Sequence, residues 1–187
     1  MGIGDTSDTA ATLLRRLAVH YRQHPVTSGS GHSYISSEPR ATATAPGIPV
    51  NLRVVDYIDD SVDEIEREVR AANPDAEQRP EELDRVYQWY VESTYNSPES
   101  VQQRRNTIVV RQAMESGIAM GDTTVVRPHR CPACRRLSLL WEARTSRALC
   151  TYTPCRDENG RARRWTLANL AYEYIAARKN IRRVSAT

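Results

Sequence analysis

An apolar stripe between residues 52 and 69 is the clearest periodic feature of the chain. Hydrophobic side chains recur there at steps of three and four residues, the spacing of one face of an α-helix; they are Leu52, Val55, Ile58, Val62, Ile65 and Val69. Acidic residues fill most of the other positions, and the pair Asn73-Pro74 marks the end, because the residue before a proline avoids helical backbone angles. The pattern predicts a long helix with one apolar and one acidic face.

Two further helices are predicted downstream, each from its own apolar stripe. One begins near Pro80, a residue type favoured in the first turn of a helix, and its stripe consists of Leu83, Val86, Tyr87, Tyr90 and Val91. The other begins near Ser97-Pro98-Glu99 and ends before Gly121; its stripe is less regular and consists of Val101, Ile108, Val109, Gln112 and Ala113. Because three stripes need to be buried together, residues 50–121 are expected to form a small, acidic helical bundle.

The first 49 residues contain one weaker helical pattern and one stretch without periodicity. Within an N-terminal segment of residues 1–23, residues 8–23 are expected to form a helix that joins the bundle, and its apolar positions are Leu13, Leu14, Leu17 and Tyr21. Residues 24–49 are rich in Ser, Thr, Gly and Pro, a composition typical of a loop or linker.

The last third of the chain has a different pattern, a β-hairpin followed by a helix. Residues 137–142 form a short apolar run expected to be a strand, residues 143–146 a turn, and residues 147–149 the return strand. After Thr166, a residue type suited to helix capping, a final stripe consists of Leu167, Leu170, Ala171, Tyr174 and Ile175. This segment is interpreted either as one continuous amphipathic helix or as the start of a helix-turn-helix whose second helix holds Ile181 and Arg183.

All four cysteines lie in two close pairs that flank the predicted hairpin. Cys131 and Cys134 are separated by two residues, and Cys150 and Cys155 by four. Tetrahedral Zn²⁺ takes four soft ligands, and two such pairs brought together by a hairpin supply them. The spacing predicts a structural zinc ion, because four thiolates leave no coordination position for water. Two alternatives stay open: disulfides or free thiols, and His129 in place of one cysteine.

These elements together predict a mainly α fold: a small helical bundle followed by a zinc-ribbon β-hairpin and a C-terminal helix. The boundary between the two parts is expected near residue 121, with the basic zinc ribbon and the C-terminal helix in residues 122–187.

Composition narrows the class of protein. The chain has 187 residues, of which 40% are hydrophobic and 26% charged, as in globular proteins. No run approaches the roughly 20 apolar residues that cross a bilayer, so no membrane partner is expected. The start of the sequence lacks the basic and apolar regions of a secretory signal, and a cytoplasmic location is therefore expected.

Charge divides the chain into two unlike parts. Residues 1–126 carry 12 basic and 19 acidic side chains, a net charge of −7, whereas residues 127–187 carry 14 basic and 4 acidic ones, a net charge of +10. A basic field with interleaved aromatic residues favours nucleic acid, DNA or RNA. The candidate contacts are Arg130, Arg135, Arg136, Arg147, Arg156, Arg161, Arg163, Arg164, Trp165, Arg178, Lys179, Arg182 and Arg183.

Other interpretations of this charge remain. The basic residues are also consistent with an ordinary solvated surface, or with an adaptor whose zinc ribbon contacts another protein in a larger assembly. The acidic bundle is a candidate surface for homo-oligomer formation. We expect a non-enzymatic protein, because the sequence contains no recognisable set of nucleophile, base and open metal site.

The order of these features resembles that of small zinc-ribbon proteins of actinobacterial phages and their hosts, most of which have no assigned function. The resemblance covers roughly residues 50–175 and rests on three segments: the acidic stretch of residues 54–69, the motif Cys131-Pro-Ala-Cys134, and Cys150 to Cys155 followed by Arg-Asp and a Trp-led helix. It implies a zinc cofactor and a phage or host genomic setting, and it implies no particular activity. With the nucleic-acid binding expected of the basic region, this setting is consistent with a phage or host regulator.

Overall fold

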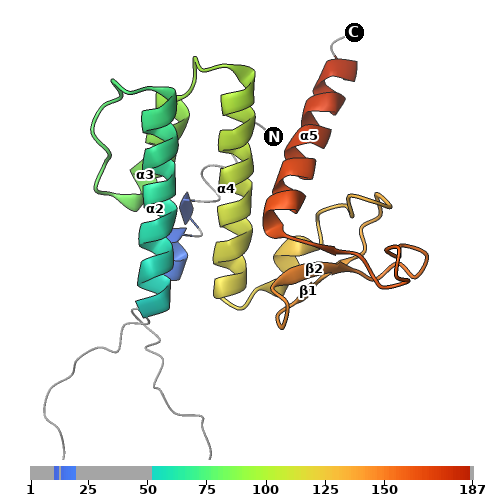
Figure 1. The fold of residues 1–187 in the computed structure, drawn as a ribbon. Helices are drawn as coiled ribbons and strands as arrows, with labels where there is room; N and C mark the ends of the chain where they lie inside the picture. Colours follow the sequence, from blue (N-terminus) through green and yellow to red (C-terminus); the bar gives the residue numbers. More distant parts are fainter. Residues whose placement is uncertain (1–10, 13, 20–51, 186–187) are drawn as a thin grey trace, which may run out of the picture.

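The computed structural model of the chain describes residues 11–12, 14–19 and 52–185 (Figure 1). Its helices are α2 (Leu52–Ala72), α3 (Leu83–Ser93), α4 (Glu99–Ala119) and α5 (Leu167–Ser185), with a short 3₁₀ helix, η1 (Thr123–Val126). Three strands, β1 (Leu139–Glu142), β2 (Arg147–Cys150) and β3 (Arg164–Trp165), form one antiparallel sheet. The expectation of a mainly α fold with a small β element is therefore confirmed.

The predicted helices are found close to their expected positions. The backbone N–H of Asn73 still donates to the carbonyl oxygen of Val69, and Pro74 then ends α2. The N-terminal helix is described only in part: residues 11–12 and 14–19 are helical, whereas Tyr21 and the predicted linker of residues 24–49 lie outside the described residues. No helix in the described part of the chain is long and apolar enough to span a membrane.

The predicted stripes of α2, α3 and α4 contribute to one apolar core, here called the first core. It is built by the N-terminal helical residues together with α2, α3 and α4, and its buried members are Ala11, Leu14, Val62, Ile65, Val69, Val86, Tyr87, Trp89, Tyr90, Ile108 and Val109. Side-chain burial of this kind supplies most of the stability of short helices.

Helix α4 also contributes to a second core on its opposite side. Val110 and Met114 of α4 pack there with residues of η1, the sheet, the cysteine pairs and α5, and the other buried members are Val126, Cys131, Leu139, Ala148, Cys150, Cys155, Leu167, Leu170 and Ala171. In Figure 1, α4 lies between α2 and α5, which it contacts on either side. The irregular stripe of α4 thus reflects a helix that is apolar on two faces.

The hairpin prediction is confirmed and one strand is added. β1 pairs with β2 in the register Leu139↔Cys150, across a turn at residues 143–146. β3, which no sequence pattern indicated, pairs with β2 through Ala148↔Trp165. Two residues are too few to show the alternation by which strands are recognised.

Helix α5 is continuous from Leu167 to Ser185. Thr166 caps its first turn, because its hydroxyl oxygen accepts from the backbone N–H of Asn169 at 3.1 Å. The structure therefore agrees with one continuous helix in this range, and shows no turn that would divide it into a helix-turn-helix.

Candidate metal centre and the basic residues around it

The four cysteine sulfurs come together in one cluster. All four Sγ atoms lie within 4.8 Å of one another, and the pairs Cys131–Cys155 and Cys134–Cys150 are each 3.8 Å apart. None of these cysteines is in a disulfide. A group of four thiols at this spacing could hold a metal ion.

Two loops and the hairpin position the sulfurs. In the first cysteine loop, residues 131–136, the N–H of Cys131 donates to the carbonyl oxygen of Arg136 and the N–H of Arg135 donates to that of Cys131. Arg135 takes a left-handed backbone conformation, with φ of 59°, to close this turn. In the second cysteine loop, residues 150–156, the N–H of Cys155 donates to the carbonyl oxygen of Tyr152.

The cluster forms one wall of the second core. Cys131, Cys150 and Cys155 are buried, and Cys134 is half-buried. The hydroxyl of Ser138, a residue that no sequence motif indicated, lies 3.2 Å from the Sγ of Cys150 and 4.0 Å from that of Cys134. A hydroxyl at this position can donate to a thiolate and orient it as a ligand.

The thiols differ in proton affinity. Burial raises the pKa of Cys131, and burial together with contacts with the neighbouring sulfurs raises that of Cys155 to about 12. Burial also opposes ionisation of Cys134, but the backbone N–H of Arg136 and the neighbouring sulfurs lower its pKa to about 7. Four thiolates at such short distances repel one another, so the fully ionised cluster requires a cation among the sulfurs.

His129 stands apart from the sulfur cluster. It is buried, with its ring 5.0 Å from that of Tyr174 in an edge-to-face arrangement, and burial lowers its pKa. The group of potential ligands found among the described residues consists of the cysteines alone. The structure thus gives no support to the alternative in which His129 replaces a cysteine.

Basic residues surround both cysteine loops. Arg130, Arg135 and Arg136 are exposed at the first loop, where the Arg130 Nη1 donates to the carbonyl oxygen of Arg135 at 2.9 Å. At the second loop, the Nε of the half-buried Arg163 donates to the carbonyl oxygen of exposed Arg156, also at 2.9 Å. The backbone thus brings basic side chains from both loops close to the cysteine cluster.

The remaining predicted contacts lie in three settings. Arg147 and Arg161 are exposed, whereas Arg164 forms an ion pair with Glu142 at 2.9 Å. Trp165 packs against the second core with its indole Nε1 buried.

Helix α5 holds the last four predicted contacts. Lys179 pairs with Glu99 at 2.7 Å, and the Nη1 of Arg178 donates to the hydroxyl of Tyr174 at 3.2 Å. The side chains of Arg182 and Arg183 lie outside the described residues.

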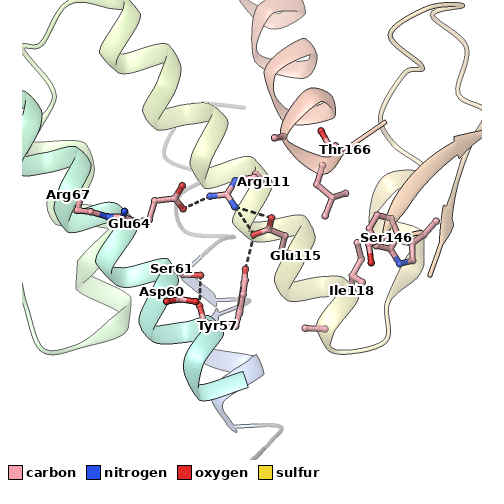
Figure 2. Close-up of a pocket in the computed structure, with 14 residues that line it drawn as sticks. Tyr57, Asp60, Ser61, Glu64, Arg67, Arg111, Glu115, Ile118, Ser146 and Thr166 are labelled. Atoms are coloured by element: carbon pink, nitrogen blue, oxygen red, sulfur yellow. Dashed lines mark hydrogen bonds and ion pairs between the residues drawn. The ribbon is translucent and has the colours of Figure 1, made fainter. Parts of the chain in front are cut away.

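A second feature of interest is a cleft of about 820 Å³ between the two cores. Figure 2 shows Glu64 of α2 and Glu115 of α4 meeting at Arg111, whose Nη1 donates to Glu115 at 3.0 Å and whose Nη2 contacts Glu64. The hydroxyl of Tyr57 donates to the same Glu115 at 3.4 Å. Trp141 also lines the cleft. Sequence reasoning missed this network because its members belong to different helices.

Comparison with known proteins adds no relative. Neither the family models, nor the curated proteins, nor the solved structures contain a match to this chain. The functional interpretation therefore rests on the geometry of the chain itself.

Proposed function

We propose that the cysteine cluster holds one structural Zn²⁺ ion, through Cys131, Cys134, Cys150 and Cys155. At a Zn–S distance of about 2.3 Å, the edges of a regular tetrahedron of sulfurs are about 3.8 Å long, and two of the sulfur pairs here are 3.8 Å apart. Four thiolates complete the coordination shell, so the ion would stabilise the second core and would not take part in catalysis.

Metal analysis tests this assignment directly. We expect the purified chain to contain one zinc per molecule, and Cys134→Ser to reduce the zinc content. Chelation should remove amide-exchange protection from residues 131–165, because zinc binding contributes on the order of 10 kcal/mol to the folding of such sites. Helices α2 and α3, which supply none of the ligands, should lose much less protection than this segment. Unchanged protection around the cysteines after complete metal removal would contradict the assignment.

We further propose that the basic residues around this site bind DNA or RNA, and that the protein is a non-enzymatic nucleic-acid-binding protein. The observation that carries this proposal is the left-handed conformation of Arg135. Non-glycine residues pay roughly 1–2 kcal/mol for this conformation, and strained positions of this kind cluster at functional sites. An exposed arginine held there, beside Arg130 and Arg136, suits recognition of an anionic partner.

The salt dependence of binding tests the proposal. Neutralised phosphates release counterions, so log K should fall linearly with log salt concentration, steeply between about 50 and 200 mM. Replacing exposed arginines of the two loops, in Arg136→Gln with Arg156→Gln, should reduce the slope by about one to two units. Arg67→Gln with Arg85→Gln, exposed positions on α2 and α3, is the matched control and should leave the slope unchanged. The proposal fails if the chain does not bind at low salt.

The cleft favours a second candidate function, that of an adaptor for another protein. Its acidic side chains include Asp60, Glu64 and Glu115, and its apolar side chains include Trp141 and Leu167. A protein partner would then bind between the two cores, and its affinity should fall in Trp141→Ala while nucleic-acid binding is retained. The resemblance to small zinc-ribbon proteins of phages and their hosts is compatible with either function.

A further inference from the structure

An accessible guanidinium plane lies at the first cysteine loop. The guanidinium carbon of Arg136 is 4.2 Å from the centroid of the Tyr152 ring. Arg136 is nevertheless exposed, so the phenol ring supports the guanidinium without enclosing it. Contact of this kind between arginine and an aromatic ring is favourable and restricts the motion of a long side chain. The loop thus presents a flat, oriented cation to solvent.

An exposed aromatic ring is also present on α5, the helix that contacts the same loop through an ion pair. Tyr172 is 53% exposed, and its neighbour Glu173 forms an ion pair with Arg135 of the loop at 2.9 Å. Leu137, which follows Arg136, is 61% exposed. Exposed apolar side chains gathered beside cationic ones are typical of binding surfaces.

The Tyr172 ring and the guanidinium plane of Arg136 are suited to stacking on unpaired bases. In single strands, the bases expose their faces and stack on aromatic rings and on arginine planes. In a duplex the faces are covered by neighbouring base pairs, and proteins contact phosphates and the edges in the grooves. Neither Tyr172 nor the supported plane of Arg136 would meet a base face in a duplex.

The described part of α5 also lacks what a duplex-reading helix needs. Such a helix lies in the major groove with polar and basic side chains toward the bases and backbone. The exposed side chains that are described on α5 are uncharged: Ala168, Asn169, Tyr172 and Ala177. Lys179 is held in its ion pair with Glu99. The exposed part of α5 that is described therefore offers an aromatic ring for stacking and carries little charge.

We infer that the nucleic acid bound at this surface is single-stranded, with bases stacked on Tyr172 and on Arg136. This inference rests on the proposed nucleic-acid-binding function. The other arginines around the two cysteine loops contact the phosphates, and the two flat groups hold the bases without selecting among them, because every base has a stacking face.

Fluorescence anisotropy with labelled oligonucleotides tests the inference on the zinc-loaded full chain. The probes are a mixed-sequence DNA strand of about 12 nucleotides, the same sequence in RNA, and the DNA duplex formed with its complement. We expect at least one single strand to bind roughly tenfold or more tightly than the duplex. Binding to the duplex that is equal or tighter overturns the inference but leaves the proposed function intact, whereas absence of binding to every probe overturns both.

A tyrosine variant separates stacking from charge. Tyr172→Ala should weaken single-strand binding by roughly five- to one-hundred-fold, the range measured for the loss of one stacked base, and should leave the salt slope unchanged because no charge is removed. Tyr95→Ala is the control, since Tyr95 is 70% exposed and lies in the connection between α3 and α4. If Tyr172→Ala binds as tightly as Tyr95→Ala, the stacking role is wrong.

Discussion

Replacement of Arg135 by glycine should make the fold more stable and the binding weaker. Arg135 has a φ of 59° in the turn of the first cysteine loop. Glycine adopts this conformation without the contact between Cβ and the backbone that other residues suffer. If Arg135 is present for its charge, replacing it should lower the affinity for nucleic acid while the relief of backbone strain raises the stability of the fold.

The expected gain is small but measurable. Relief of the left-handed conformation contributes roughly 1–2 kcal/mol. The greater freedom of glycine in the unfolded chain costs roughly 0.5–1 kcal/mol. The ion pair with Glu173 contributes at most about 0.5 kcal/mol, because the Arg135 side chain is 62% exposed. The central values of these three contributions sum to a stabilisation of about 0.5 kcal/mol, or about 1–2 °C in Tm for a chain of this size.

Calorimetry and anisotropy on the zinc-loaded protein measure the two effects separately. Ser146 is the matched control, since it has a φ of 50° in the β1–β2 turn and carries no charge. Ser146→Gly should raise Tm by a similar amount and leave nucleic-acid affinity unchanged, whereas Arg135→Gly should lower the affinity about three- to tenfold. A fall in Tm for Arg135→Gly alone would mean that the side chain is needed for the fold, and unchanged affinity would refute its role in binding.

Three further substitutions test the packing. Burial raises the pKa of Tyr57 to about 12, so the folded chain retains this proton more tightly than the unfolded chain and loses stability as pH rises from about 10 to 12; in urea titrations, Tyr57→Phe should show a shallower fall over this range. The Cβ added in Gly117→Ala would lie 2.6 Å from Val125 Cγ1, and we expect a loss of about 1–3 kcal/mol that Val125→Ala partly restores. Arg105 is buried and donates to the hydroxyl of Thr94 at 3.0 Å, so Arg105→Met should lower the free energy of unfolding by about 1–3 kcal/mol, measured by the same titration. A fall with pH in Tyr57→Phe as steep as in the parent would contradict the first prediction, and equal stability of Gly117→Ala or Arg105→Met and the parent would contradict the other two.

Features encoded by neighbouring residues could be predicted from the sequence. The stripe that includes Val62, Ile65 and Val69 gave the position of α2, and the spacing of the cysteine pairs indicated the cluster that the structure shows. Both signals depend on fixed geometry, the 3.6-residue period of a helix and the short turn between paired cysteines.

Features that depend on tertiary contacts could not be predicted. The buried Arg105 donates to the carbonyl oxygen of Val91 at 3.2 Å, a partner that only the packing of α3 on α4 provides. The ion pairs of Arg164 with Glu142 and of Lys179 with Glu99 likewise join separate elements. From composition alone, both cations would be expected to be available to nucleic acid. In the folded chain, each is already paired with a carboxylate.

Helix α4 links the two halves of the molecule thermodynamically. Ile108 and Val109 belong to the first core and Val110 and Met114 to the second, so both cores order this one helix. Any ligand that stabilises one side of this helix lowers the entropic cost of ordering the other. An ion bound by the sulfurs would therefore make α2 and α3 more resistant to unfolding, although these helices supply none of its ligands.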